Sequence, residues 1–351
     1  MANVRSLRSS PVRWRTEGDD AQEALFPDAD RHIGRGEFRG MEFLHVKARS
    51  IINTLPASGR LPFRHTINAY RGCSHACTYC FARPTHGYLG LDIGEGFERQ
   101  VVVKVNAVER LRAELDPRRW CGEPIAMGTN TDPYQRAEGK YHLTRGLVEE
   151  LGRARNPFSI LTKSTLVLRD ADVLAEAAER TDVTVSFSVG TLDEEVWRAT
   201  EPGTPPPRKR LEALAKLRER GLSCGVLVAP VLPGLSDTAE SIDAVVAAAT
   251  EAGATSVSGG MVVYLKPGVR EVFLGHLAET HPDLVPRYEA MFRGVNAPSA
   301  ERQRVADLLH QAQARHRGRP LAPPRTAPHR NPRPRPSPAP KATGTQLGLG
   351  M

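Results

Sequence analysis

Short apolar runs alternate along the middle of the chain with longer stretches in which apolar residues recur at helical spacing. Six of the short runs predict β-strands, and their continuous apolar character is typical of strands that are covered on both faces. We expect these strands at residues 66–70, 125–128, 159–162, 183–188, 223–229 and 256–263.

Four of the longer stretches predict amphipathic helices between these strands. They are residues 143–151, 173–178, 208–220 and 242–249, the last with an Asp-x-x-Glu start at Asp237 and a stop at Gly253. Strands that alternate with helices predict repeated βα units and a parallel sheet. We expect an α/β fold that forms a partial (β/α)6 TIM-like barrel, although periodicity alone does not separate a partial barrel from an open sheet.

The two ends of the chain differ from this central body. The first 40 or so residues are polar and rich in Gly, Asp and Arg, and residues 315–351 are rich in Pro, Arg and Ala without apolar periodicity. Such segments bury too little apolar surface to offset the entropy lost on ordering. We therefore expect a flexible N-terminal extension at 1–40, a core domain at 41–310 and a disordered basic tail at 315–351.

The formal net charge of +8 comes from this tail. After Asp307 the chain has eight basic residues and no acidic ones, which leaves 40 basic and 40 acidic residues before that point. The body is neutral, so the charge indicates that the tail could contact phosphates of a nucleic acid, in a salt-dependent way. The tail has no aromatic side chains on which bases could stack.

Composition excludes several classes of protein. The 351 residues are 40% hydrophobic and 25% charged, and no stretch approaches the roughly 18 consecutive apolar residues of a membrane helix. The basic N-terminus lacks the apolar core of a secretory signal. The five cysteines are an odd number and too clustered for a disulfide framework. We expect a cytoplasmic protein with no membrane contact.

Three of the cysteines, Cys73, Cys77 and Cys80, fall within eight residues directly after the first predicted strand. Such density in a reduced setting indicates a metal site. Zinc would need His75 or His86 to complete a Cys3His set. One compact Cys-x3-Cys-x2-Cys loop without a second ligand pair favours a [4Fe–4S] cluster, with one iron open to a non-protein ligand.

This cysteine spacing, with an aromatic residue before the last cysteine and βα units behind it, resembles the radical S-adenosylmethionine (radical SAM) superfamily. Five segments narrow the resemblance to the bacterial radical SAM proteins related to spore photoproduct lyase, often described as DNA repair photolyase-like. They are Tyr-Arg-Gly-Cys at 70–73, Cys-Phe-Ala-Arg-Pro-Thr-His at 80–86, Gly-Thr-Asn-Thr-Asp-Pro-Tyr-Gln at 128–135, Thr-Lys-Ser at 162–164 and Ala-Pro-Val-Leu-Pro-Gly-Leu at 229–235.

The resemblance implies roles for particular residues. It makes Cys73, Cys77 and Cys80 the cluster ligands and Tyr79 the aromatic that flanks the adenine of S-adenosylmethionine. The segment that takes the methionine amino group lacks the family's Gly-Gly-Glu, which leaves Asn130 and Asp132 as acceptors. The further cofactor contacts that it implies are Gly128 and Thr129 beside those acceptors, and Lys163 with Ser186 or Ser188 for the methionine carboxylate and the ribose.

The implied activity is reductive cleavage of S-adenosylmethionine to methionine and a 5′-deoxyadenosyl radical, which abstracts a hydrogen from the substrate. The electron would come from an external flavodoxin- or ferredoxin-like reductant. The substrate is open, and a nucleic-acid lesion is one candidate. The hydrogen-donating cysteine of the spore lyase is replaced here by Thr129 or Asn130, and Cys121 lies ahead of the strand. The alternative is a zinc- or cluster-stabilised nucleic-acid-binding protein without radical chemistry.

Three further features suggest contacts around this site and in the tail. Arg83 and His86 follow the cysteine motif, where they are candidates to face the substrate. Glu201 begins a proline-rich stretch that forms either a rigid flap near the site or a plain helix entry. The stretch 346–349 resembles the core of bacterial sliding-clamp-binding peptides, which makes a sliding clamp a candidate partner of the tail.

Overall fold

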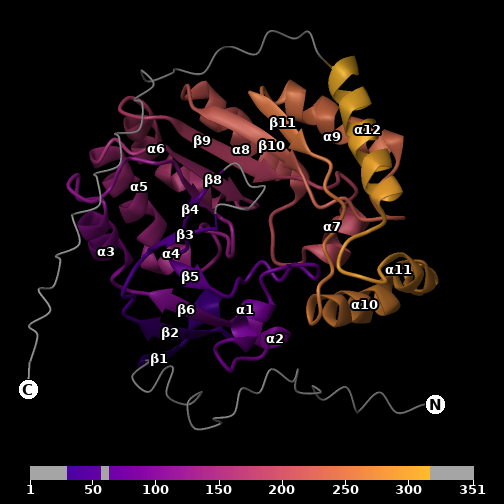
Figure 1. The fold of residues 1–351 in the computed structure, drawn as a ribbon, viewed down its shortest axis with the longest axis horizontal. Coiled ribbons are helices and arrows are strands. Elements are labelled where there is room, and N and C mark those ends of the chain that lie inside the picture. The colour runs from indigo at the N-terminus through magenta and orange to yellow at the C-terminus, as the bar shows by residue number, and fades with distance from the viewer. Residues whose placement is uncertain (1–29, 57–62, 317–351) are drawn as a thin grey trace, which may run out of the picture.

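The computed structural model describes residues 30–56 and 63–316, and its main element is a seven-stranded sheet (Figure 1). The strands lie side by side in chain order, and every neighbouring pair from β4 onward is parallel. Their bounds are β3 (Ile52–Thr54), β4 (His65–Ile67), β7 (Ile125–Met127), β8 (Phe158–Thr162), β9 (Val183–Ser188), β10 (Ser223–Val228) and β11 (Ser256–Gly259). Six parallel strands in chain order confirm the expected succession of βα units, and a partial barrel has the same order.

Helices connect the parallel strands and cover one face of this sheet (Figure 1). The apolar positions of the predicted helices are buried there, as Leu147 and Leu151 illustrate. The connecting helices are α5 (Leu143–Arg153), α6 (Ala171–Ala178), α8 (Pro207–Glu219) and α9 (Ala239–Glu251). The alternation of apolar and polar positions thus correctly predicts both the elements and the faces they bury.

Helix α9 begins one residue later than the sequence predicts. The side chain of Thr238, rather than Asp237, accepts the capping hydrogen bond, which the backbone N–H of Ser241 donates over 3.1 Å. Asp237 forms an ion pair with Arg304 of α12 (Ser299–Arg315), which packs along α9. Because Asp237 is used in this tertiary contact, the capping role passes to the next residue.

A second, four-stranded sheet was not predicted from the sequence. Its order is β1 (Asp30–Ile33), β2 (Glu42–Val46), β6 (Gln100–Lys104) and β5 (Tyr70–Arg71). The strand predicted at 66–70 is therefore divided: β4 stays in the main sheet, and the chain crosses to the second sheet before Tyr70. The cysteine loop consequently starts from the second sheet.

The outer boundaries of the body also differ from the predicted ones. Residues 30–40, placed by the sequence in the N-terminal extension, contain β1 and the 3-10 helix η3 (Gly36–Phe38), and α12 extends past residue 310. The rest of the extension and the tail beyond residue 316, with its stretch at 346–349, lie outside the described residues. Within the described ranges, no helix is long and apolar enough to cross a membrane.

Further helices flank the two sheets, and α1 follows the cysteine loop directly (Figure 1). They are α1 (Pro84–Gly87), α2 (Glu95–Arg99), α3 (Ala107–Glu114), α4 (Glu138–Tyr141), α7 (Glu194–Thr200), α10 (Val269–Thr280) and α11 (Val285–Met291), with the 3-10 helices η4 (Thr165–Asp170) and η5 (Pro282–Leu284).

Small polar residues occupy part of the sheet face opposite the connecting helices. Along β9, Val185 and Phe187 are buried in the core, whereas Thr184 and Ser186 on the other face are half-buried. Next to them in β10 is Gly225, where a Cβ would lie 3.0 Å from the Ser186 hydroxyl oxygen. A side chain larger than glycine at Gly225 would therefore contact the Ser186 hydroxyl.

Candidate functional site

The cysteine loop runs from β5 to α1 and brings its three thiols together. Cys73 and Cys77 are buried and Cys80 is half-buried. Burial raises the pKa of Cys73 well above its usual range, and the charge of Asp132 raises it further. Thiolates at Cys77 and Cys80 would also repel one at Cys73, which shows that the three sulfurs are neighbours. Three thiolates in a buried loop need a cationic group between them, so this donor set fits a metal centre.

The spacing of the sulfurs distinguishes between the two metals. In tetrahedral zinc sites with Zn–S bonds of about 2.3 Å, the sulfurs lie roughly 3.8 Å apart. In the part of the chain that the structure describes, the three Sγ atoms do not all lie within 4.8 Å of one another. This spacing is wider than that around a single tetrahedral zinc ion and is compatible with thiolates that bind separate irons of a cluster.

The segment after β7 holds the backbone of the cysteine loop. The Thr131 hydroxyl donates to the carbonyl of Gly72 over 2.7 Å, and the Gln135 amide donates to the same oxygen over 3.0 Å. The side-chain oxygen of Gln135 accepts from the backbone N–H of Ser74 over 3.0 Å. Two buried side chains thus fix the loop at the residues that flank its first cysteine.

Asp132, one of the two predicted acceptors for the cofactor's amino group, has its carboxylate occupied. Its oxygens accept from the Thr162 hydroxyl and the Lys163 backbone N–H, each over 2.7 Å, and lie 3.3 Å from Nδ1 of His75. Burial alone would raise the pKa of Asp132, but His75 and these hydrogen bonds hold it below its usual value. Asp132 therefore ties the end of β8 to the cysteine loop.

The residues before Asp132 are placed by the approach of two strands. Gly128 has φ +89°, and a Cβ there would lie 2.0 Å from the carbonyl oxygen of Leu161, so only glycine fits. Asn68 bonds the next two residues: its amide lies 3.4 Å from the Thr129 hydroxyl, and its oxygen accepts from the Asn130 N–H over 3.1 Å. The Asn130 side chain stays half-buried, with only a 3.5 Å contact to Thr85.

A buried ionic network lies on the other side of the cysteine loop. Glu201 accepts hydrogen bonds from the Tyr79 hydroxyl and from the Arg210 guanidinium. Lys163 approaches Glu201 to 3.9 Å and lies 5.6 Å from the centre of the Tyr79 ring. Burial alone would raise the pKa of Glu201, but Arg210 and Lys163 keep it below its usual value. The network joins two predicted cofactor contacts, Tyr79 and Lys163, to a carboxylate for which the sequence had suggested only a flap or a helix entry.

The turn that carries Glu201 also packs directly on the cysteine loop. The backbone N–H of Thr78 donates to the carbonyl of Thr200 over 3.0 Å, and that of Gly203 donates to the carbonyl of His75 over 3.1 Å. A Cβ at Gly203 would lie 2.2 Å from the carbonyl oxygen of Ser74. This approach needs glycine, and it makes the turn part of the site.

Gly203→Ala is therefore expected to push the turn off the cysteine loop. We expect a loss of about 1–3 kcal/mol in the free energy of unfolding and less iron retained after reconstitution. Gly139→Ala is the control, because nothing lies within 4 Å of a Cβ there. Thermal unfolding and iron analysis of both variants test this; equal iron content in the two would contradict it.

Arg83 and His86 do not face an open site. Arg83 is fully buried; it donates to the carbonyls of Cys77 and Gly94 and forms an ion pair with Glu98. The buried ring of His86 lies 2.8 Å through Nε2 from the carbonyl of Gln100. Both side chains are buried and bonded to other parts of the protein, so the expectation that they face the substrate is wrong.

The two serines on β9 differ in availability. Ser188 is buried, and its hydroxyl donates to the carbonyl of Ala229 over 2.7 Å. Ser186 is half-buried on the sheet face opposite the connecting helices.

The two remaining cysteines lie outside the cysteine loop. Cys224 is fully buried in β10 and is a core residue, and burial raises its pKa to about 12. Cys121 is half-buried outside the cysteine loop.

Residues 67–265 match the family model of the Radical SAM superfamily. An uncharacterized protein of Mycobacterium tuberculosis is 45% identical over 301 residues, which cover 84% of this chain and 88% of that protein. An uncharacterized protein of Methanocaldococcus jannaschii is 29% identical over 197 residues, 56% of this chain and 70% of that protein.

Among solved structures, spore photoproduct lyase complexed with dinucleoside spore photoproduct aligns with a TM-score of 0.61 and 16% identity over 78% of this chain and 79% of the lyase chain. At this identity the likeness establishes a shared fold. The region matched by the family model starts at the end of β4 and contains the cysteine loop and every later parallel strand. The chain therefore belongs to the radical SAM superfamily and is a radical SAM enzyme.

Proposed function

We propose that Cys73, Cys77 and Cys80 hold a [4Fe–4S] cluster and that S-adenosylmethionine binds beside it. The observation that supports this most is the trio of neighbouring thiols on a loop that is fixed by Thr131 and Gln135. When bound and reduced, this pair of cofactors supplies a 5′-deoxyadenosyl radical that abstracts a hydrogen from the substrate. An external flavodoxin- or ferredoxin-like protein supplies the electron.

The chain's own residues bind and orient S-adenosylmethionine. Asn130 is the better acceptor for the methionine amino group, because the carboxylate of Asp132 is already occupied. Lys163 provides the positive charge for the methionine carboxylate. Burial alone would lower its pKa, but neighbouring acidic groups raise it. Tyr79 presents a ring fixed by Glu201 to the adenine. Ser186, rather than Ser188, has a hydroxyl available for the ribose.

Apolar packing keeps water away from the thiols. Cys77 and Tyr79 belong to a buried cluster with Val196, Leu232 and Val263, contributed by α7 and by the segments that follow β10 and β11. Exclusion of water protects a radical from side reactions and strengthens the charge interactions within the site.

Lys163→Gln is expected to lower the affinity for S-adenosylmethionine by about 10- to 100-fold. A hydrogen bond to a charged group contributes about 1.5–3 kcal/mol, and the substitution removes that charge. The iron content should stay at the wild-type level, because Lys163 is not a cluster ligand. Calorimetric titration of the reconstituted variant measures the effect; unchanged affinity would remove Lys163 from the cofactor site.

We propose a substrate that presents an unpaired base or another flat group. Phe81, directly after Cys80, is 51% exposed, and Tyr88 at the end of α1 is 68% exposed. Exposed aromatic rings at a nucleic-acid site stack on bases. Thr129 and Asn130 offer no S–H bond where the resemblance puts the spore lyase's cysteine, so we propose a lesion or modification other than the one that enzyme repairs.

The tail is proposed to add a phosphate-binding arm, and a sliding clamp remains a candidate partner of its end. Removal of residues 317–351 deletes seven basic residues. We expect weaker binding to single-stranded DNA and RNA and a shallower dependence on salt, by about 0.7 in slope for each phosphate that the arm no longer neutralises. Binding measured at two salt concentrations tests this; identical curves for both chains would exclude the arm.

Anaerobic reconstitution followed by metal analysis tests the proposed cofactors. We expect about four iron and four sulfide ions per chain, absorbance near ~400 nm and binding of S-adenosylmethionine. A colourless protein with zinc would support the alternative, a zinc-stabilised nucleic-acid-binding protein. A coloured protein that does not bind S-adenosylmethionine would support a cluster-stabilised one without radical chemistry.

A further inference from the structure

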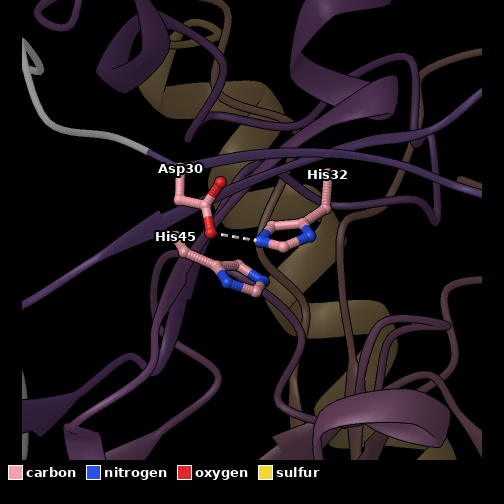
Figure 2. A group of neighbouring side chains, drawn as sticks. All are labelled: Asp30, His32 and His45. Carbon is pink, nitrogen blue, oxygen red and sulfur yellow. Dashed lines mark hydrogen bonds and ion pairs between the residues drawn. The ribbon is translucent and has the colours of Figure 1, made fainter.

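A second group of metal-ligating side chains lies on the hairpin of β1 and β2, in the four-stranded sheet. Asp30 and His32 are two residues apart on β1 and so point to the same face, and Asp30 pairs directly with His45 on β2. One ligand atom from each of the three lies within 4.8 Å of the other two (Figure 2). Within the described ranges, no other trio of His, Cys, Asp or Glu meets this spacing.

Neighbouring groups orient both imidazole rings. Nε2 of His45 lies 2.7 Å from the Tyr141 hydroxyl, which leaves Nδ1 as the nitrogen free for another partner. Nε2 of His32 lies 2.8 Å from a carboxylate oxygen of Asp30. The two rings are 3.9 Å apart between centroids, tilted by 31°, as Figure 2 shows. The contact of His45 with Tyr141 resembles the hydrogen bond that usually orients a ligating histidine from outside the ligand set, whereas the contact of His32 with Asp30 joins two of the proposed ligands.

Lys140 is a cation near His45, and it lies against aromatic rings. Lys140 is directed over the rings of Phe43 and Tyr141, 5.0 and 5.2 Å from their centres.

We infer that Asp30, His32 and His45 bind a divalent transition-metal ion of the zinc class, separate from the cysteine loop. Two imidazoles and one carboxylate form a ligand set that zinc accepts, with a fourth position left to water. The ion would cross-link β1 and β2, because its proposed ligands come from both strands. Because β2, β6 and β5 follow in the same sheet, it would strengthen the support from which the cysteine loop starts.

Zinc titration of the reconstituted enzyme tests this site while the cysteines are occupied by the cluster. We expect about one zinc ion per chain in addition to the iron, and a higher unfolding temperature with zinc than without. His32→Ala and His45→Ala should weaken zinc binding at least about tenfold with iron unchanged, and Tyr141→Phe should weaken it by about tenfold. His276→Ala, an exposed histidine on α10, is the matched control.

Two outcomes would overturn the site. One is a wild-type enzyme that takes up no zinc beyond its cluster metals. The other is zinc uptake by the His32 and His45 variants equal to that of the His276 variant. If an alanine variant loses its iron, Asp30→Asn is measured instead, because it keeps the size of an exposed side chain and removes its charge. Unchanged zinc affinity in Asp30→Asn would equally contradict the inference.

Discussion

Cys77→Ala is expected to abolish both the cluster and the formation of 5′-deoxyadenosine. The three loop thiols are the proposed protein ligands, and removal of one of the three thiolates leaves a second iron without a protein bond. We expect an iron content well below that of the wild type and no 5′-deoxyadenosine above background. Iron analysis and chromatography of the anaerobically reconstituted variant measure these effects.

Cys121→Ala is the matched control for this variant. Cys121 is half-buried and lies outside the loop, so its replacement should leave iron content and 5′-deoxyadenosine formation near wild type. If Cys77→Ala kept its iron and its activity, the assignment of the loop as the cluster site would be wrong. If Cys121→Ala became inactive while it kept its iron, Cys121 would have a role in the radical reaction.

Arg210→Met is expected to destabilise the protein by about 3–5 kcal/mol. Arg210 is fully buried and bonded to Glu201, and its removal leaves a buried carboxylate without its main partner. Lys163 is 3.9 Å from Glu201 and compensates only in part. The free energy of unfolding, measured in urea, gives the size of the effect.

A double variant separates the effect of the ion pair from that of packing. Glu201→Gln added to Arg210→Met removes the unpaired charge and keeps an acceptor for the Tyr79 hydroxyl. We expect the double variant to be more stable than Arg210→Met alone. A cost below about 1 kcal/mol for Arg210→Met would show that the pair behaves like an exposed salt bridge. The buried network would then not support the cysteine loop.

The sequence predicts the chemistry of the site better than it predicts the residues that hold the cysteine loop in place. The cysteine motif is contiguous, whereas the residues that contact it are distant in the sequence. The contact between Ser74 and Gln135 joins residues 61 apart, and that between Tyr79 and Glu201 joins residues 122 apart. No local periodicity marks pairs at such separations. The resemblance suggested a cofactor role for Asp132, whereas the structure shows its carboxylate bonded to the protein.

In the fold as well, elements that depend on local apolar spacing were predicted, and the sheet that depends on distant pairing was not. Strands β7 to β10 and helices α5, α6, α8 and α9 follow from apolar spacing within each segment. The second sheet does not, because β5 has only two residues and because β1 and β2 are joined by residues 34–41, which contain η3. These short strands are specified by their partners in the sheet rather than by their own sequence.

The structure braces the cysteine loop on three sides. Thr131 and Gln135 hold its start, Arg83 holds the carbonyl of Cys77 from behind, and Gly203 packs against it from the turn after α7. A loop held in this way by the protein needs little reorganisation when it binds a cluster. This is the physical reason to expect ready reconstitution.

Formation of 5′-deoxyadenosine by the reconstituted wild-type enzyme tests directly whether the cysteine loop supports cleavage of S-adenosylmethionine. The protein, loaded with iron and sulfide under anaerobic conditions, is mixed with dithionite and S-adenosylmethionine, and the products are separated by chromatography. We predict 5′-deoxyadenosine and methionine in equal amounts, dependent on both dithionite and Cys77. A fully loaded protein that binds S-adenosylmethionine and forms no 5′-deoxyadenosine would show that the cysteine loop does not support cleavage of this cofactor.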